Sequence, residues 1–173
     1  MSDIEDFRRA KDHMFVHDAD SPISPGDREH FAGLAYFAPD AALVIEAQVE
    51  PPAETGDLLM PTSTGDEVVY QRVGAVRFDV DGAPAQLTLF SVEGDSDLFV
   101  PFRDATSGKE TYGAGRYLEV SEPIDGRVQL DFNYAYNPYC AYSEAYSCPL
   151  PPMENWLKVP IRAGEKVYVN ASH

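Results

Sequence analysis

The hydrophobic residues of this chain repeat first with a helical period and later with a period of two. Between Asp3 and Val16 they recur every three or four positions, which predicts one short amphipathic helix. The apolar members of this helix are Ile4, Phe7, Ala10 and Met14. Two prolines and a glycine in residues 20–27 end the helical pattern, and residues 28–31 are expected to add one further helical turn.

Alternating apolar and polar positions predict half-buried strands over most of the remaining chain. The predicted strands cover residues 43–49, 76–80, 87–89, 98–102, 112–120, 128–136 and 156–161. Asp81-Gly82 separates two of them and predicts a hairpin, whereas residues 51–65 form a long polar connection. Frequent turns favour a mostly β fold, an antiparallel β-barrel or sandwich of about seven or eight strands with a short N-terminal helix. No repeat or linker divides the sequence, so residues 1–173 are expected to form a single domain.

The strongly negative charge of the chain disfavours polyanionic partners. Its 29 acidic and 13 basic side chains give a formal net charge of -16, which repels the phosphates of nucleic acids and anionic lipid headgroups. Nucleic acid and membrane partners are therefore not expected. Few lysines and an excess of aspartate over glutamate are typical of a halophilic protein, whose surface carboxylates are screened by concentrated salt. An acidic protein from an ordinary organism is the alternative interpretation.

The sequence favours a cytoplasmic location. The first residues carry acidic side chains and no apolar run of signal-peptide length. No later segment approaches the roughly 20 apolar residues that a membrane-spanning helix needs. With only two cysteines, the chain does not have the composition of a secreted disulfide scaffold.

Two glycines mark the first position where chemistry is expected. If residues 112–118 form one strand, Gly113 and Gly115 lie on one face and Arg116 lies on the other. Glycine at alternate positions weakens a strand, so either a second backbone or a ligand is expected to approach closely there.

Polar side chains alternate along the next predicted strand. A period of two places Asp131, Asn133 and Asn137 on one face. At the mouth of a barrel, Asp131 and Asn133 would orient a ligand whose carboxylate or phosphate Arg116 holds. A buried pair between Asp131 and Arg116 is the structural alternative.

Residues 137–155 form the most unusual segment of the sequence. Four prolines restrict its path and several tyrosines supply bulk with polar tips, so this loop is expected to be packed. Its cysteines, Cys140 and Cys148, are interpreted as two buried thiols, a disulfide, or a reactive thiol at Cys140. No histidine lies beside Cys140 to act as a base, and Glu154 acts as an acid or base only if it is buried. No catalytic residue is assigned.

Metal and cofactor motifs do not emerge from the sequence. The two cysteines lack the paired spacing of structural zinc sites, and His13 and His17 at helical i, i+4 spacing supply only half a site. We therefore expect no metal. There is no phosphate loop, dinucleotide fingerprint or serine elbow, so the cofactor stays unknown.

The segments PFRDATSGKETYGAGRYLEV and LDFNYAYNPYCAYSEAYSCPLPPMENWLKVPIRAGEK closely resemble the bacterial and archaeal domain-of-unknown-function family 1684. The resemblance continues through FAGLAYF at residues 31–37 and so covers most of the chain. It implies no activity, but it places motif residues at the positions that the residue patterns single out. These include Arg116, Asp131, Asn133, Asn137, Cys140, Glu154 and Asn155.

Together these features predict a site near Arg116, Asp131 and Asn133, closed by the Cys140–Asn155 loop. The ligand-binding residues expected there are Arg116, Asp131, Asn133, Asn137, Cys140, Glu154 and Asn155, and the expected ligand is a small polar or anionic molecule. The alternative is a noncatalytic structural or protein-interaction module, in which the same residues form a satisfied internal network. Enzymatic activity and oligomeric state are not assigned.

Overall fold

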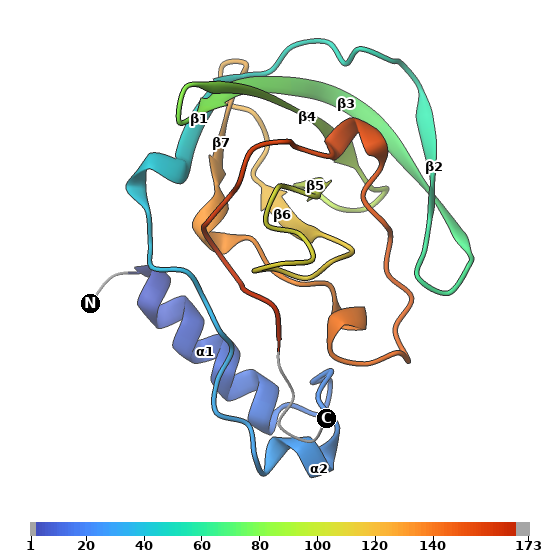
Figure 1. The fold of residues 1–173 in the computed structure, drawn as a ribbon. Helices are drawn as coiled ribbons and strands as arrows, with labels where there is room; N and C mark the ends of the chain where they lie inside the picture. The colour runs from blue at the N-terminus through green and yellow to red at the C-terminus, as the bar shows by residue number, and fades with distance from the viewer. Residues whose placement is uncertain (1–2, 169–173) are drawn as a thin grey trace.

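The computed structural model describes residues 3–168 and has two antiparallel sheets with one long helix beside them (Figure 1). The helices are α1 (Asp3–His17) and α2 (Pro25–Arg28). The strands are β1 (Val44–Gln48), β2 (Asp57–Pro61), β3 (Glu67–Val80), β4 (Ala83–Ser91), β5 (Leu98–Phe102), β6 (Arg116–Val120) and β7 (Arg127–Asp131). Short 3₁₀ turns are η1 (Ala41–Leu43), η2 (Phe132–Tyr134), η3 (Tyr139–Ala141) and η4 (Met153–Asn155).

The sheets form a sandwich that does not close into a barrel. Five strands lie in the order β2-β3-β4-β5-β6, and β1 pairs with β7 in a second sheet. The long strand β3 carries a register shift between Arg72 and Gly74, and beyond it Ala75 bridges to Glu50 just after β1. A bulge bends and twists a strand. Strand β3 can therefore pair with β2 and β4 in the larger sheet and also contact the end of β1 in the smaller sheet. The prediction of a mostly β sandwich with an N-terminal helix is confirmed.

The core lies between the sheets and follows the alternation seen in the sequence. Leu87, Leu89, Val100 and Leu130 are completely buried, and each occupies an inward position of its strand. The Asp81-Gly82 hairpin is also confirmed, since both residues have positive φ angles, as a tight two-residue β-turn requires.

The polar connection predicted over residues 51–65 is wrong in part, because it contains β2. This strand pairs with the first half of β3, which the sequence analysis also missed. Leu58, Leu59 and Met60 are three consecutive apolar residues without a polar alternation, so the period of two is hidden there. Met60 is buried, whereas Leu59 points to the outside and is 57% exposed.

The strand predicted over residues 112–120 begins only at Arg116, so the two glycines do not share a strand face. Gly115 has a φ of 107°, and a Cβ there would lie 2.6 Å from the Phe102 carbonyl oxygen. No side chain fits at that distance. Of the second backbone and the ligand expected at this position, the structure has the second backbone.

The strand predicted over residues 128–136 ends at Asp131, where η2 begins. The Asp131 carboxylate accepts a hydrogen bond from the Asn133 backbone N–H and caps this turn. The prediction that Asp131, Asn133 and Asn137 lie on one strand face is therefore wrong, because a local side-chain cap competes with the sheet.

Residues 156–161 do not form the predicted strand, although Leu157, Val159 and Ile161 are buried in alternation. This extended segment exchanges isolated hydrogen bonds with residues 103–105, and Pro160 has no N–H to continue a ladder. The helical turn predicted over residues 28–31 lies earlier, at Pro25–Arg28, because Ser24 caps it.

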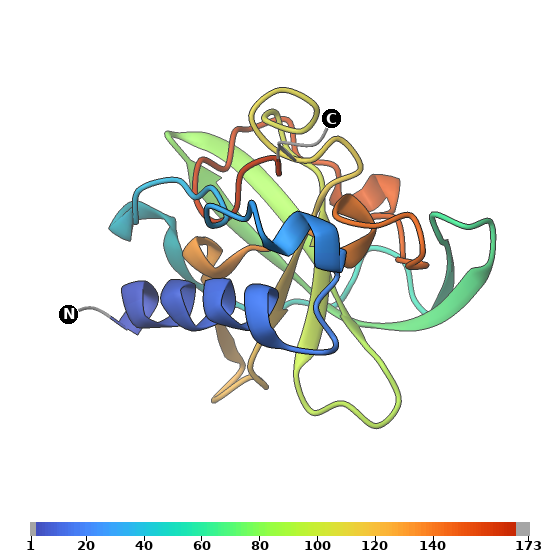
Figure 2. The ribbon, with the colours of Figure 1, turned by 90° about the horizontal axis from the view of Figure 1, so that it is seen from below.

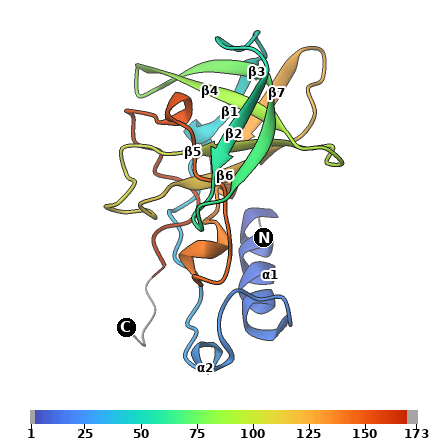
Figure 3. The ribbon, with the colours of Figure 1, turned by 90° about the vertical axis from the view of Figure 1, so that its right-hand side faces the viewer.

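Helix α1 lies below the strands and beside the chain that follows β7 (Figure 3). The Asp12 carboxylate accepts a hydrogen bond from Leu34 N–H, and Arg8 donates to the Phe37 carbonyl. Phe15 is completely buried and meets Tyr142 edge to face at 5.1 Å. Seen from below, α1 crosses in front of the strands and joins α2 through a short connection (Figure 2). No helix in residues 3–168 is long and apolar enough to cross a bilayer.

Candidate functional site

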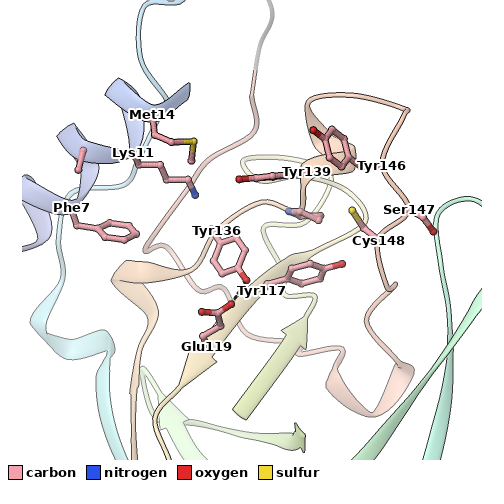
Figure 4. A pocket seen from close by; sticks show the side chains of 12 residues that line it. Phe7, Lys11, Met14, Tyr117, Glu119, Tyr136, Tyr139, Tyr146, Ser147 and Cys148 are labelled. Atoms are coloured by element: carbon pink, nitrogen blue, oxygen red, sulfur yellow. Dashed lines mark hydrogen bonds between the residues drawn. The ribbon is translucent and has the colours of Figure 1, made fainter. Parts of the chain in front are cut away.

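The apolar stripe of α1 faces a cavity of about 710 Å³, which we call the α1 cavity (Figure 4). Phe7, Ala10 and Met14 line it, and Lys11 extends into it from the same helix face. The opposite wall comes from β6 and from the chain after η2. It consists of Tyr117, Glu119, Tyr136, Pro138, Tyr139, Tyr146, Ser147 and Cys148. Helix α1, strand β6 and the chain after η2 therefore meet around one largely apolar space that contains five aromatic rings.

Lys11 is held in place by a buried ion pair. Its ammonium group contacts the Glu165 carboxylate, and it also lies 5.0 Å from the ring centroid of Tyr136. Glu165 is 1% exposed and accepts further hydrogen bonds from Asn137 N–H (3.1 Å) and the Tyr142 hydroxyl (2.7 Å). These hydrogen bonds hold the Glu165 carboxylate in place beside Lys11. The ion pair therefore neutralises the charge of Lys11 where its side chain reaches the cavity.

Glu119 places a second carboxylate at the rim of the cavity. The Tyr136 hydroxyl donates a hydrogen bond to Glu119 Oε1 at 2.9 Å, while the Glu119 side chain stays exposed. Burial, and then the charge of Glu119, raise the pKa of Tyr136 far above its ordinary value. The tyrosine therefore stays protonated at neutral pH and keeps the carboxylate in position.

Cys148 brings a thiol to the cavity wall. Its Sγ accepts a hydrogen bond from the Cys140 backbone N–H at 3.3 Å, and both cysteines are free thiols. Burial raises the pKa of Cys148 to about 11. Cys140 is half-buried, with Sγ 3.7 Å from the Tyr112 hydroxyl, whose pKa burial raises to about 12. Cys148 is thus a neutral thiol at neutral pH and a poor nucleophile.

Arg116, the anchor of the predicted site, lies in the interior. Its guanidinium donates hydrogen bonds to the carbonyls of Ile161 (2.8 Å) and Glu165 (3.1 Å), and also to that of Ala163. Asp104 lies 3.7 Å away, which makes it the ion-pair partner in place of Asp131. These contacts attach the C-terminal segment to β6.

The three predicted residues nearest to η2 also bind protein groups. Asn133 exchanges hydrogen bonds with the backbone of Asp40, and Asp131 accepts from the Asn133 amide. The Asn137 side chain donates to the Lys166 carbonyl and to the Tyr142 hydroxyl. The backbone N–H of Asn137 donates to the Glu165 carboxylate, which pairs with Lys11. Asn137 thus helps to hold the ion-pair partner of Lys11 in place.

Glu154 and Asn155 brace the opposite end of the sandwich. Arg72 donates to both oxygens of Glu154, and the Thr88 hydroxyl donates to it at 2.8 Å. Burial opposes ionisation of Glu154, but these hydrogen bonds prevail and hold its pKa below the ordinary value. The buried Asn155 side chain bonds both backbone groups of Thr88 and the carbonyl of Pro101.

The structure therefore brings together the loop expected around the site but not the seven side chains expected within it. Residues 146–148 of that loop line the α1 cavity, whereas Arg116, Asp131, Asn133, Asn137, Cys140, Glu154 and Asn155 do not. Sequence reasoning missed Lys11, Tyr117, Glu119 and Tyr136. The available signal was the stripe of Phe7, Ala10 and Met14 on the predicted amphipathic helix.

No group of three or more His, Cys, Asp or Glu side chains within residues 3–168 is arranged to hold a metal ion. The rings of His13 and His17 contact each other at a tilt of 45°, with their centroids 4.4 Å apart. Their contact is between the two rings on one face of α1.

Comparisons with known proteins agree with the fold and name no activity. The family model described as protein of unknown function (DUF1684) matches residues 29–166. The solution NMR structure of an uncharacterized protein from Haloarcula marismortui is similar over 98% of this chain and 94% of that one, with 40% sequence identity and a TM-score of 0.73. No curated protein matches the chain.

Proposed function

Because the chain belongs to the DUF1684 family, whose description states no activity, we propose from the geometry that it binds a small organic molecule in the α1 cavity. Small-molecule sites are concave, largely apolar spaces of a few hundred cubic ångströms with a few polar groups. At about 710 Å³, with largely apolar walls that include five aromatic rings and with the polar groups of Lys11 and Glu119, the α1 cavity has these features.

The observation that carries this proposal is the position of the α1 stripe. The apolar face of an amphipathic helix is normally buried against the core. Here Phe7, Ala10 and Met14 border open space, and Phe7 remains 42% exposed. A ligand with an apolar body would complete the burial that the helix pattern encodes.

Two residues singled out in the sequence, Asn137 and Arg116, help to hold the cavity residue Lys11 in place. Asn137 holds Glu165, which in turn holds Lys11 at the cavity. Arg116 ties the segment that carries Glu165 to β6. These contacts also favour the alternative, a noncatalytic module whose polar residues form an internal network, because they join protein groups only to one another.

We also propose that the acidity of the chain is an adaptation to concentrated salt. The formal net charge of -16 and the similarity to a protein of Haloarcula marismortui support this interpretation.

Filling the cavity tests the binding function. Ala10→Trp would place an indole in the α1 cavity, and we expect it to abolish the chemical-shift changes that small aromatic fragments cause at cavity residues in ¹H–¹⁵N NMR spectra. Binding of fragments to the unchanged protein is the first requirement.

Arg9→Trp is the matched control, because Arg9 directly precedes Ala10 in α1, does not line the cavity and is exposed. It should leave fragment binding intact. Fragment binding that survives Ala10→Trp, or the absence of any binding to the unchanged protein, would contradict the proposal and favour the structural module.

A further inference from the structure

We infer that the ligand of the α1 cavity is an organic ammonium compound, with an apolar body and a positively charged nitrogen. This inference rests on the proposed function and adds the charge of the ligand to it. The sequence alone suggested a small polar or anionic ligand. The inference replaces the anionic alternative, which depended on Arg116, because the guanidinium of Arg116 is engaged with carbonyls in the interior.

The walls of the cavity suit an ammonium group. Phe7, Tyr117, Tyr136, Tyr139 and Tyr146 supply five aromatic rings to one space. Aromatic faces carry partial negative charge and attract cations within about 6 Å of the ring centroid. The structure contains an example of this contact, since the Lys11 ammonium lies 5.0 Å from the centroid of Tyr136.

The carboxylate at the rim supplies charge complementarity. Glu119 is fixed by the Tyr136 hydroxyl, and it lines both the α1 cavity and a neighbouring hollow of about 630 Å³. That hollow is acidic, because Glu46, Glu122 and Asp131 also line it and Arg127 is its single basic residue. The electrostatic potential beside Glu119 therefore favours a cation.

Lys11 does not reverse this preference. Its ammonium group is already paired with Glu165, which is buried and held by Asn137 and Tyr142. An anionic ligand would have to draw Lys11 away and leave the Glu165 carboxylate unpaired in the interior, which is strongly unfavourable. A cation placed between the aromatic rings and Glu119 requires no such rearrangement.

Three probes of similar shape test the inference. Benzyltrimethylammonium, benzyl alcohol and phenylacetate share an aromatic body and differ in charge. They are titrated into the whole protein at matched ionic strength, with binding followed by NMR shifts of cavity residues. We expect the ammonium probe to bind about tenfold more tightly than the alcohol, and phenylacetate to bind most weakly.

Glu119→Gln removes the charge at the rim while retaining an oxygen that can accept the Tyr136 hydrogen bond. We expect it to weaken binding of the ammonium probe by roughly threefold to tenfold and to leave benzyl alcohol unaffected. Glu93→Gln is the matched control, because Glu93 is exposed and lines neither hollow. Tyr146→Leu should likewise weaken the cation more than the alcohol.

The outcomes separate the two proposals. If benzyl alcohol or phenylacetate binds as tightly as the ammonium probe, and Ala10→Trp blocks that binding, the charge inference is wrong and the cavity remains a binding site. Equal losses for Glu119→Gln and Glu93→Gln would also overturn the role of the rim carboxylate. If none of the probes binds, both the charge inference and the proposed function fail.

Discussion

At the scale of single residues, Arg116 shows how a buried charged side chain can join two segments of the fold. It is 1% exposed, and its guanidinium joins β6 to the carbonyls of residues 161–165. The guanidinium also lies over the Phe102 ring, with Cζ 5.2 Å from the ring centroid. Removing the side chain would leave Asp104 without its buried ion-pair partner and three carbonyls without these donors.

Arg116→Ala is therefore expected to lower the free energy of unfolding by about 3–5 kcal/mol. Denaturant titration followed by circular dichroism measures this loss. Arg162→Ala is the control, because Arg162 is 59% exposed and pairs with Glu110 at the surface, where such pairs contribute at most about 1 kcal/mol. Similar small losses for both variants would show that the interior contacts of Arg116 do not stabilise the fold.

At the scale of elements, β6 and the chain after η2 carry tyrosines that are largely shielded from water: Tyr117 is buried, and Tyr136 and Tyr142 are half-buried. Burial raises the pKa of Tyr142 and of Tyr117 well above the ordinary value for tyrosine, and the carboxylate of Glu165 adds to the effect at Tyr142. Burial likewise raises the pKa of Tyr136. These side chains stay neutral in the folded protein at pH values where they would ionise in an unfolded chain.

Stability should consequently fall at alkaline pH. Above about pH 10 the unfolded tyrosines lose their protons, while the folded ones retain them, so the native state binds more protons and the free energy of unfolding decreases as pH rises. Cys148, with a pKa of about 11, acts in the same direction. Denaturant titrations at neutral pH and at several alkaline pH values measure the effect.

The absorbance of tyrosinate gives the corresponding control. In the folded protein a fraction of the ten tyrosines should titrate only at the pH of unfolding, whereas in guanidinium all should titrate near the ordinary value. A single folded-state transition near pH 10 would contradict the burial argument.

The sequence predicted those elements that are specified by a local hydrophobic period or by turn residues. Strand β5 matches its expected span, and α1 and the Asp81-Gly82 hairpin follow from helical period and turn chemistry. The segment 156–161 shows the limit, because its alternating burial is real but its hydrogen-bond partners lie in residues 103–105. Local alternation reports burial and does not report whether a neighbouring strand is present.

The site was harder to predict for the same reason. Lys11 and Glu165 are separated by 154 positions, and Tyr136 and Glu119 by 17, so neither pair produces a local motif. The unusual loop could be recognised from its prolines and tyrosines, but which of its side chains face the cavity depends on how α1 packs against it. That packing depends on long-range contacts such as those of Phe15 with Tyr139 and Tyr142.

At the scale of the whole molecule, the formal net charge of -16 makes self-repulsion a general property of the folded state. Electrostatic screening reaches about 10 Å at 0.1 M salt and shortens to about 3 Å at 1 M. Concentrated salt should therefore stabilise the compact chain.

We expect the melting temperature to increase from low salt to multimolar KCl, because screening reduces the repulsion between carboxylates. Thermal unfolding followed by circular dichroism provides the measurement. Sucrose of equal osmolality is the control for effects that do not depend on charge. A higher melting temperature in low salt would exclude the halophilic interpretation.

The position of α1 also has a consequence for substitutions in the cavity wall. The family model begins at residue 29, whereas Phe7, Ala10, Lys11 and Met14 form one wall of the cavity. The matched range thus contains the sheets and the opposite wall but not this helix. Substitutions on the inner face of α1 would change the shape of the cavity without altering a strand. Under the proposed function, such substitutions would change which ligand fits the cavity while the strands stay the same.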